Sequence, residues 1–129
     1  MGKERRIFNR VPLELNGSLF LSQEKDGEKL SRPVNCRIVN LSKKGAGIII
    51  RQIIVDNLHL FFGPLESDEL ILHLAIGQGN GEAAMTLAGR PLWFDRILFE
   101  EQQPFKMGIE FLEKIGEDDY RRLKKLAGN

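Results

Sequence analysis

Apolar and polar residues alternate along most of this chain, and a period of two predicts strands rather than helices. In 11–21, apolar residues alternate with polar residues or proline, which predicts a strand with one buried face. Gly17 interrupts the packing face of this strand and predicts a bend or a bulge. Comparable patterns or short apolar runs predict further strands at 34–40, 46–51, 69–76, 82–95 and 106–111, with the strand at 82–95 broken near Gly89-Arg90-Pro91.

Turn signals separate these strands. The charged segment 22–31 contains Asp26-Gly27, a strong hairpin dipeptide, so the first two strands are predicted to form an antiparallel hairpin. Asn80-Gly81 predicts another tight turn, and 41–45 is a further turn. The stretch 52–68 is the least regular, and it predicts a short strand over 55–62 closed by a turn at Gly63-Pro64.

Only the C-terminal end has helical periodicity. Acidic residues at 117–119 begin this segment and basic residues follow, an order that complements the helix dipole. Tyr120, Leu123 and Ala127 form one apolar face, and Gly128 ends the segment. Many short antiparallel strands followed by one helix predict a mainly β fold, a small closed or nearly closed barrel with a C-terminal α-helix.

Length and composition fit a single globular domain. The 129 residues suffice for a core, and 42% of them are hydrophobic. Because 19 basic residues nearly balance 18 acidic ones, any site for an anion must be local. The single Cys36 excludes an internal disulfide. We find no signal-peptide pattern and no apolar run long enough for a bilayer, so we expect a cytoplasmic protein without membrane insertion.

Three arginines lie just before the first strand, in the polar arm 1–10. Arg6 and Arg10 are spaced as RxxxR, and Arg5 precedes them. A guanidinium group is a planar fork of donors that suits phosphate oxygens or the O6/N7 edge of guanine. One interpretation is a flexible arm that folds over a bound anion. The alternative is a solvated tail whose arginines pair with acidic neighbours.

A second short motif occupies the turn after the second strand. Asn40, Ser42 and Gly45 are spaced as NxSxxG, with Lys43 and Lys44 inside the motif. In one interpretation the polar side chains face a ligand, the glycine lets that ligand approach the backbone, and the lysines add charge. In the other, Asn and Ser cap their own turn, the glycine supplies a positive φ angle, and the lysines are solvated.

These two motifs, in this order and separated by one hairpin, resemble the PilZ family, whose members bind cyclic di-GMP. The resemblance extends to the strand pattern and the C-terminal helix, so it covers nearly the whole chain. It implies a split, antiparallel β-barrel of about six or seven strands over 11–129, preceded by the flexible arm 1–10.

The resemblance also implies site residues. Arg6 and Arg10 would hold phosphate and guanine, and the NxSxxG residues would form the opposite wall. Asn40 stands where family members often have Asp, so no negative charge orients an arginine there. Arg5 resembles an additional arginine in variants that accept a stacked pair of ligand molecules.

Trp93 is the only tryptophan, and its place in the strand 82–95 allows two interpretations. Either it packs in the core, or its ring flanks a guanine of the ligand, the position that the resemblance favours. His59 and His73 lack clustered partners, so we predict strand residues rather than metal ligands. No nucleophile–base pair, Walker loop or dinucleotide fingerprint occurs, so we expect neither an enzyme nor a cofactor.

The resemblance implies a receptor domain that binds cyclic di-GMP and thereby changes its contacts with an unidentified protein partner or adjacent domain. It further implies a bacterial role in motility, biofilm or polysaccharide regulation. Two alternatives stay open: a degenerate relative that is a protein-interaction adaptor without nucleotide binding, and a small-barrel RNA or single-stranded DNA binder. The near-balanced charge argues against a nucleic-acid polymer as partner.

Overall fold

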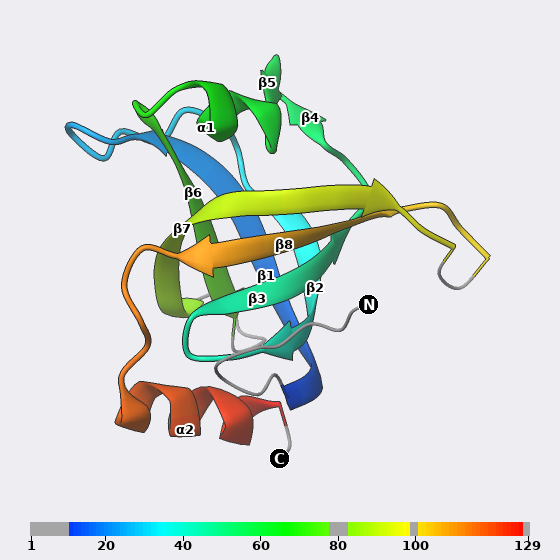
Figure 1. The fold of residues 1–129 in the computed structure, drawn as a ribbon, viewed down its shortest axis with the longest axis vertical. Helices are drawn as coiled ribbons and strands as arrows, with labels where there is room; N and C mark the ends of the chain where they lie inside the picture. Colours follow the sequence, from blue (N-terminus) through cyan, green and yellow to red (C-terminus); the bar gives the residue numbers. More distant parts are fainter. Residues whose placement is uncertain (1–10, 78–82, 99–100, 128–129) are drawn as a thin grey trace.

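The core of the molecule is a closed barrel of six strands, all joined antiparallel (Figure 1). The structure is a computed structural model that describes residues 11–77, 83–98 and 101–127. In spatial order the strands are β1 (Val11–Gln23), β2 (Val34–Leu41), β3 (Gly45–Ile50), β8 (Phe105–Phe111), β7 (Ala83–Arg96) and β6 (Leu70–Gly77). This arrangement confirms the predicted small antiparallel barrel with a C-terminal helix.

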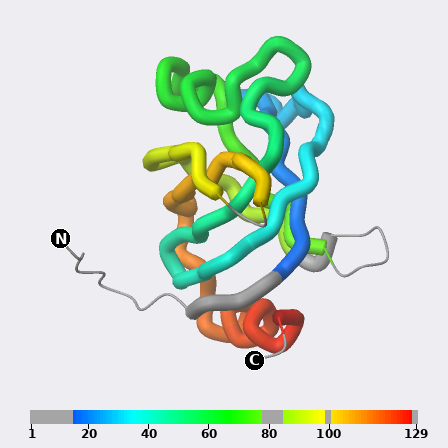
Figure 2. The backbone as a smooth tube through the Cα atoms, turned by 90° about the vertical axis from the view of Figure 1, so that its right-hand side faces the viewer, coloured from blue at the N-terminus to red at the C-terminus, as the bar shows by residue number. Residues whose placement is uncertain are grey.

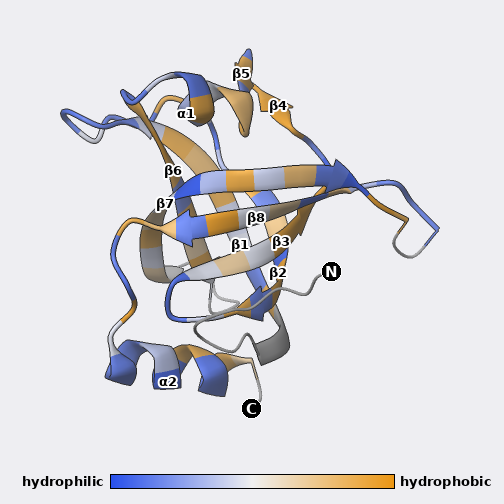
Figure 3. Ribbon diagram, in the orientation of Figure 1, coloured by the Kyte–Doolittle hydropathy of each residue, from blue (hydrophilic) through white to orange (hydrophobic). Residues whose placement is uncertain are grey.

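Alternation along the strands separates the barrel interior from its outer face. In β1, β2 and β6 the residues that face inward are the apolar members of the alternating sequence pattern. Leu19, Ile38 and Ile76 are three of them, and each is fully buried. Hydrophobic and hydrophilic residues accordingly alternate along the strands (Figure 3). Burying one such side chain contributes about 1.5–3 kcal/mol, so the interior of the barrel supplies the main stabilising term.

One end of the barrel is covered by a cap made of β4 (Ile54–Val55), β5 (Leu58–His59) and α1 (Phe62–Glu66) (Figure 1). The prediction of one strand over 55–62 with a turn at Gly63-Pro64 was wrong. The chain instead turns at Asp56 and Asn57, whose φ angles are 54° and 66°. Asp and Asn enter this left-handed region more readily than other non-glycine residues. Gly63-Pro64 belongs to α1, because proline is tolerated in the first turn of a helix.

Two irregularities of the strands also differ from the predictions. Gly17 is not a bulge: it keeps its register with Cys36 and Ile76, and the register shift of β1 falls between Pro12 and Leu15. A Cβ atom on Gly17 would lie 2.7 Å from the carbonyl oxygen of Ala75, so the glycine allows close approach to β6.

The predicted break at 89–91 was also wrong, because β7 is continuous from Ala83 to Arg96. The strand instead contains a register shift between Pro91 and Trp93. A bulge adds one residue to the strand and bends it, but the pairing with the neighbouring strand continues. The alternation of the sequence is therefore interrupted although the strand is not.

The helix α2 (Glu117–Leu126) lies at the end of the barrel opposite the cap (Figure 1). Leu123 is fully buried, and Tyr120 and Ala127 pack against the core, which confirms the predicted apolar face. Gly128, the predicted end of the helix, lies outside the described residues. In the described part of the chain, neither helix has the length and apolar character that a membrane crossing requires.

We expect Gly17→Ala to destabilise the barrel by about 1–3 kcal/mol, the usual effect of overpacking a close contact. The added methyl group would meet a backbone carbonyl, which cannot rotate away as a side chain can. The free energy of unfolding in urea measures the effect. Gly116→Ser is the control, because nothing lies within 4 Å of a Cβ atom at Gly116; equal stabilities of the two variants would contradict the prediction.

His59 holds the start of α1 in place within the cap. Its Nδ1 atom accepts hydrogen bonds from the backbone N–H groups of Phe61 (3.1 Å) and Phe62 (3.0 Å). Burial lowers the pKa of His59 from its ordinary value of 6.5, against a smaller opposing effect of the Glu66 carboxylate. Protonation of Nδ1 would remove the acceptor from both N–H groups.

The free energy of unfolding should therefore depend on pH through His59. Because the pKa is lower in the folded state, the stabilisation is complete above the ordinary value of 6.5 and decreases as the pH falls below it. His59→Asn keeps an acceptor that does not titrate, so its stability should decrease less over the same range. Parallel pH profiles of the two proteins, measured by urea unfolding, would show that this histidine is not the titrating group.

Candidate functional site

Four residues form a continuous row across the outer face of the barrel. Asn40 on β2 pairs with Gly47 on β3, Gly47 pairs with Gly108 on β8, and Gly108 pairs with Trp93 on β7. We call these four residues the cross-strand row. Neighbouring strands are about 4.8 Å apart, so the row is about 14 Å long. Its two middle positions are glycines.

The side chains at the two ends of the row lie over the glycines. A Cβ atom on Gly47 would be 2.7 Å from Nδ2 of Asn40, and one on Gly108 would be 2.5 Å from Nε1 of Trp93. The Trp93 side chain is 41% exposed. The alternative that Trp93 packs in the core was therefore wrong: its indole lies on the outer face, with one side against the backbone and much of its surface in solvent.

The side chain of Ser42 closes the turn that contains the NxSxxG motif. Its Oγ accepts hydrogen bonds from the N–H groups of Lys44 and Gly45, both at 3.1 Å, and its own N–H donates to the Gly45 carbonyl at 2.9 Å. Ser42 is 4% exposed. The motif serine thus caps its own turn, as one of the two interpretations of the sequence proposed.

Gly45 has a steric role rather than a conformational one. It does not have a positive φ angle, since Gly27 is the only described glycine that does. A Cβ atom on Gly45 would lie 2.3 Å from the carbonyl oxygen of Ile109. The glycine therefore permits β3 and β8 to pair closely at the point where the turn ends.

The arm 1–10 is joined to the barrel beside the turn. Val11, the first residue of β1, pairs with Leu41, and Pro12 pairs with Asn40. Figure 2 shows β1 running from the end of the barrel that carries α2. Arg5, Arg6 and Arg10 lie outside the described residues, so only their point of attachment is placed: Arg10 is bonded to a residue that pairs next to Asn40.

Charged residues flank the cross-strand row unequally. On one side the next outward positions are Arg37 on β2, Ile49 on β3 and Lys106 on β8, which are register partners of one another. On the other side Glu110 lies beside Gly45. The sequence did not single out Gly47 and Gly108, which lie in the row, or Arg37 and Lys106, which lie beside it. The one sequence signal that could have found Gly47 and Gly108 is a glycine inside a strand, which often marks a place where another group approaches the backbone closely.

The turn is also fastened to the C-terminal part of the chain. The Lys44 carbonyl accepts the N–H of Phe111, and the Lys43 carbonyl accepts the N–H of Ile115, both at 2.8 Å. Tyr120 donates its hydroxyl hydrogen to the Leu41 carbonyl at 3.4 Å.

An ion pair adds to these backbone contacts. The Lys43 ammonium group pairs with the Glu117 carboxylate in the first turn of α2 and, by this hydrogen bond and its charge, lowers the pKa of Glu117. Lys43 is thus engaged with α2, whereas Lys44 is exposed.

The described residues offer little for metal or thiol chemistry. They contain no group of three or more His, Cys, Asp or Glu side chains arranged to hold a metal ion. Burial raises the pKa of the Cys36 thiol to about 12, so it is not a reactive thiolate near neutral pH. His73 accepts or donates a 2.6 Å hydrogen bond with the Ser22 hydroxyl on the neighbouring strand.

Comparison with known proteins gives matches in structure but not in sequence. No family model matches the chain, and no curated protein matches it. The PilZ domain of YcgR from Escherichia coli, solved with c-di-GMP, matches with a TM-score of 0.58 at 11% identity, over 96% of this chain and 89% of that one.

Two further structures match over nearly all of this chain but about half of their own. The Bacillus subtilis inhibitor of motility MotI/DgrA matches with a TM-score of 0.51 at 15% identity, over 96% of this chain and 50% of that one. The PlzA protein of Borreliella burgdorferi, in complex with c-di-GMP, matches with a TM-score of 0.56 at 12% identity, over 92% and 49%. With its closed six-stranded barrel and C-terminal helix, this chain has the fold of a PilZ domain.

Proposed function

We propose that this chain is a receptor domain for cyclic di-GMP and that the ligand lies on the cross-strand row. One observation carries the proposal: Val11, to which the arginine-bearing arm is attached, pairs with Leu41, directly beside Asn40 at the end of the cross-strand row. Two of the structures that share the fold were solved with c-di-GMP, which supports the same ligand class.

The arm is long enough to extend over much of the row. Arg6 stands five positions before Val11, and an extended chain spans up to about 3.5 Å per residue, so Arg6 can lie as far as about 17 Å from the start of β1. The row is about 14 Å long and begins one strand spacing from β1. Arg6 can therefore reach groups of a ligand over much of the row, whereas Arg10, next to Val11, would bind near its Asn40 end.

The barrel would supply the opposite wall of the site. Gly47 and Gly108 leave room for the Asn40 and Trp93 side chains to lie across the strands. Asn40 would face the ligand with its amide at one end of the row, and Trp93 with a half-exposed aromatic face at the other. Stacking of a base on an aromatic side chain contributes about 1–3 kcal/mol. Ser42 and Gly45 would act mainly by holding the turn in shape. Arg5 would add a third guanidinium group for a second, stacked ligand molecule.

Ligand binding would change the surface next to α2. The turn beside the site is bonded to the β8–α2 connection through the carbonyls of Lys43 and Lys44. Binding of the ligand between the arm and the row would hold the arm against this end of the barrel, and fixing a segment in place uses part of the interaction energy. We propose that a protein partner or an adjacent domain recognises the reshaped surface, as in cytoplasmic regulation of bacterial motility or biofilm formation.

Loss of either motif arginine should weaken cyclic di-GMP binding. A hydrogen bond to a charged group contributes about 1.5–3 kcal/mol, so Arg6→Ala and Arg10→Ala should each raise the dissociation constant at least tenfold. Isothermal titration calorimetry measures affinity and molar ratio together. Arg122→Ala, an exposed arginine on α2, is the control and should bind normally.

Near-normal affinity of both arm variants would refute the proposed role of the arm. Absence of binding by the unchanged protein at saturating ligand, seen also as no thermal shift, would favour the adaptor alternative.

Trp93 provides a direct optical test of ligand position. It is the only tryptophan of the chain and stands at one end of the row. Cyclic di-GMP should change its fluorescence with the same concentration dependence as the calorimetric signal, because a guanine next to the indole displaces water from it. Trp93→Leu should bind several-fold more weakly. Unchanged fluorescence at full saturation would place the ligand elsewhere.

A further inference from the structure

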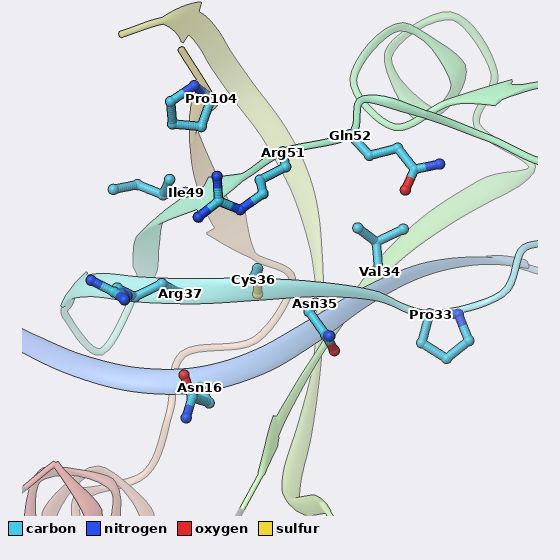
Figure 4. Close-up of a pocket in the computed structure, with 10 residues that line it drawn as sticks. All are labelled: Asn16, Pro33, Val34, Asn35, Cys36, Arg37, Ile49, Arg51, Gln52 and Pro104. Atoms are coloured by element: carbon cyan, nitrogen blue, oxygen red, sulfur yellow. The ribbon is translucent and has the colours of Figure 1, made fainter. Parts of the chain in front are cut away.

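A separate groove lies on the outer face of β1, β2 and β3. Its volume is about 490 Å³, which falls within the roughly 300–1,000 Å³ typical of small-molecule sites. None of the four residues of the cross-strand row lines it. Figure 4 shows its lining side chains, which come from all three strands and from the connections that flank them.

Among the described residues that line the groove, two are arginines and none carries a carboxylate. Arg37 comes from the middle of β2, and Arg51 directly follows β3. In Figure 4 the Arg51 side chain extends back toward the stretch of β2 that carries Arg37. Arg51 is exposed and has no ion pair with any residue in the described ranges. Its guanidinium group is therefore available to an anion.

Three carboxamides add neutral hydrogen-bonding groups to the same groove. Asn16 and Asn35 are exposed, and their side chains make no hydrogen bond to another described residue. Gln52 donates its Nε2 hydrogen to the Ile54 carbonyl at 3.3 Å, which fixes the side chain. An amide group presents a donor and an acceptor side by side, the pattern that matches the edge of a heterocyclic base.

The outer face is apolar at Ile49, which lies in the groove lining and is 9% exposed. Val34 and Cys36 also line the groove, but both are inward positions of β2 and belong to the hydrophobic core. Pro33 and Pro104 add ring faces at two places in the lining. A planar ring could contact the apolar surface of Ile49 and the prolines while its edge meets the amides. A purely charged ligand, such as a run of acidic residues, would use the arginines but leave the amides and this apolar surface without a role.

From this combination we propose that the groove is a second site, which binds a phosphate-bearing small molecule of the mononucleotide class. Arg37 and Arg51 bind the phosphate, because a guanidinium fork pairs with phosphate oxygens. The amides of Asn16, Asn35 and Gln52 bind the edge of the base, and the apolar surface contacts its face. The site uses no residue of the arm and none of the cross-strand row.

The test is calorimetric or NMR titration of the full chain with 5′-GMP, without cyclic di-GMP. Arg51→Ala should weaken binding at least tenfold, and Arg51→Lys should recover part of the loss, because it restores the charge without the fork. Arg37→Ala should have an effect of similar size. Guanosine, which lacks the phosphate, should bind at least tenfold more weakly than 5′-GMP. Arg122→Ala should bind like the unchanged protein, and circular dichroism verifies that each variant is folded.

The Arg6→Ala/Arg10→Ala double variant separates this site from the proposed receptor site. It should lose cyclic di-GMP binding and keep 5′-GMP binding. Loss of both ligands would overturn the second site, because the nucleotide would then depend on the arm. Normal 5′-GMP affinity in Arg51→Ala and Arg37→Ala would also overturn it. So would binding of an oligo-aspartate peptide without binding of 5′-GMP, a result that would identify a surface for acidic protein segments.

Discussion

The pairing of β3 with its two neighbours requires glycine at the positions where those neighbours approach most closely. A side chain at position 45 would collide with the Ile109 carbonyl of β8, and backbone cannot rotate aside. At Gly47 and Gly108 a Cβ atom would meet only side chains, those of Asn40 and Trp93. Gly45 is therefore required for the barrel to close, whereas Gly47 and Gly108 determine the shape of its outer face.

Two residues of the NxSxxG motif have structural roles in the turn. Ser42 reaches the N–H groups two and three residues ahead, and Gly45 fits against β8, so the spacing of the motif follows from the geometry of the turn. A barrel that binds no nucleotide would need the same turn. The motif residues Ser42 and Gly45 thus support the fold more directly than they support a ligand. A ligand would be bound chiefly by the arm arginines and by Asn40 and Trp93, the proposed receptor residues that lie outside this turn.

The sequence predicted the barrel because alternation is a local signal, and each strand contains its own. It did not predict the cross-strand row, because positions 40, 47, 93 and 108 come together only through long-range pairing of β3 with β8 and of β8 with β7. It missed α1 because five residues around Gly63-Pro64 carry too little periodicity to distinguish a helical turn from a loop.

Trp93 shows how one irregularity reverses such a prediction. Leu87, Gly89 and Pro91 follow the inward period of two, so uninterrupted alternation would direct residue 93 inward as well. The bulge between Pro91 and Trp93 shifts the period by one residue. As a result Phe94 packs against the core and Trp93 lies outside. Alternation alone predicts that Trp93 faces the core, and only the resemblance to the PilZ family predicted that it lies on the outer face.

Distances along the strands also distinguish the two proposed anion sites by their expected dependence on the arm. Arg37 and Lys106 are the next outward positions after Asn40 and Gly108, and Lys106 lies two residues, or about 7 Å, from Gly108. That separation is shorter than the screening length of about 8 Å at physiological salt. Arg51 is four residues, or about 13 Å, from Gly47, so screening largely removes its effect on the row. The row thus has Arg37 and Lys106 nearby, and in the proposed receptor site the arm would supply the further cations. The proposed groove site would take both of its cations, Arg37 and Arg51, from the barrel itself.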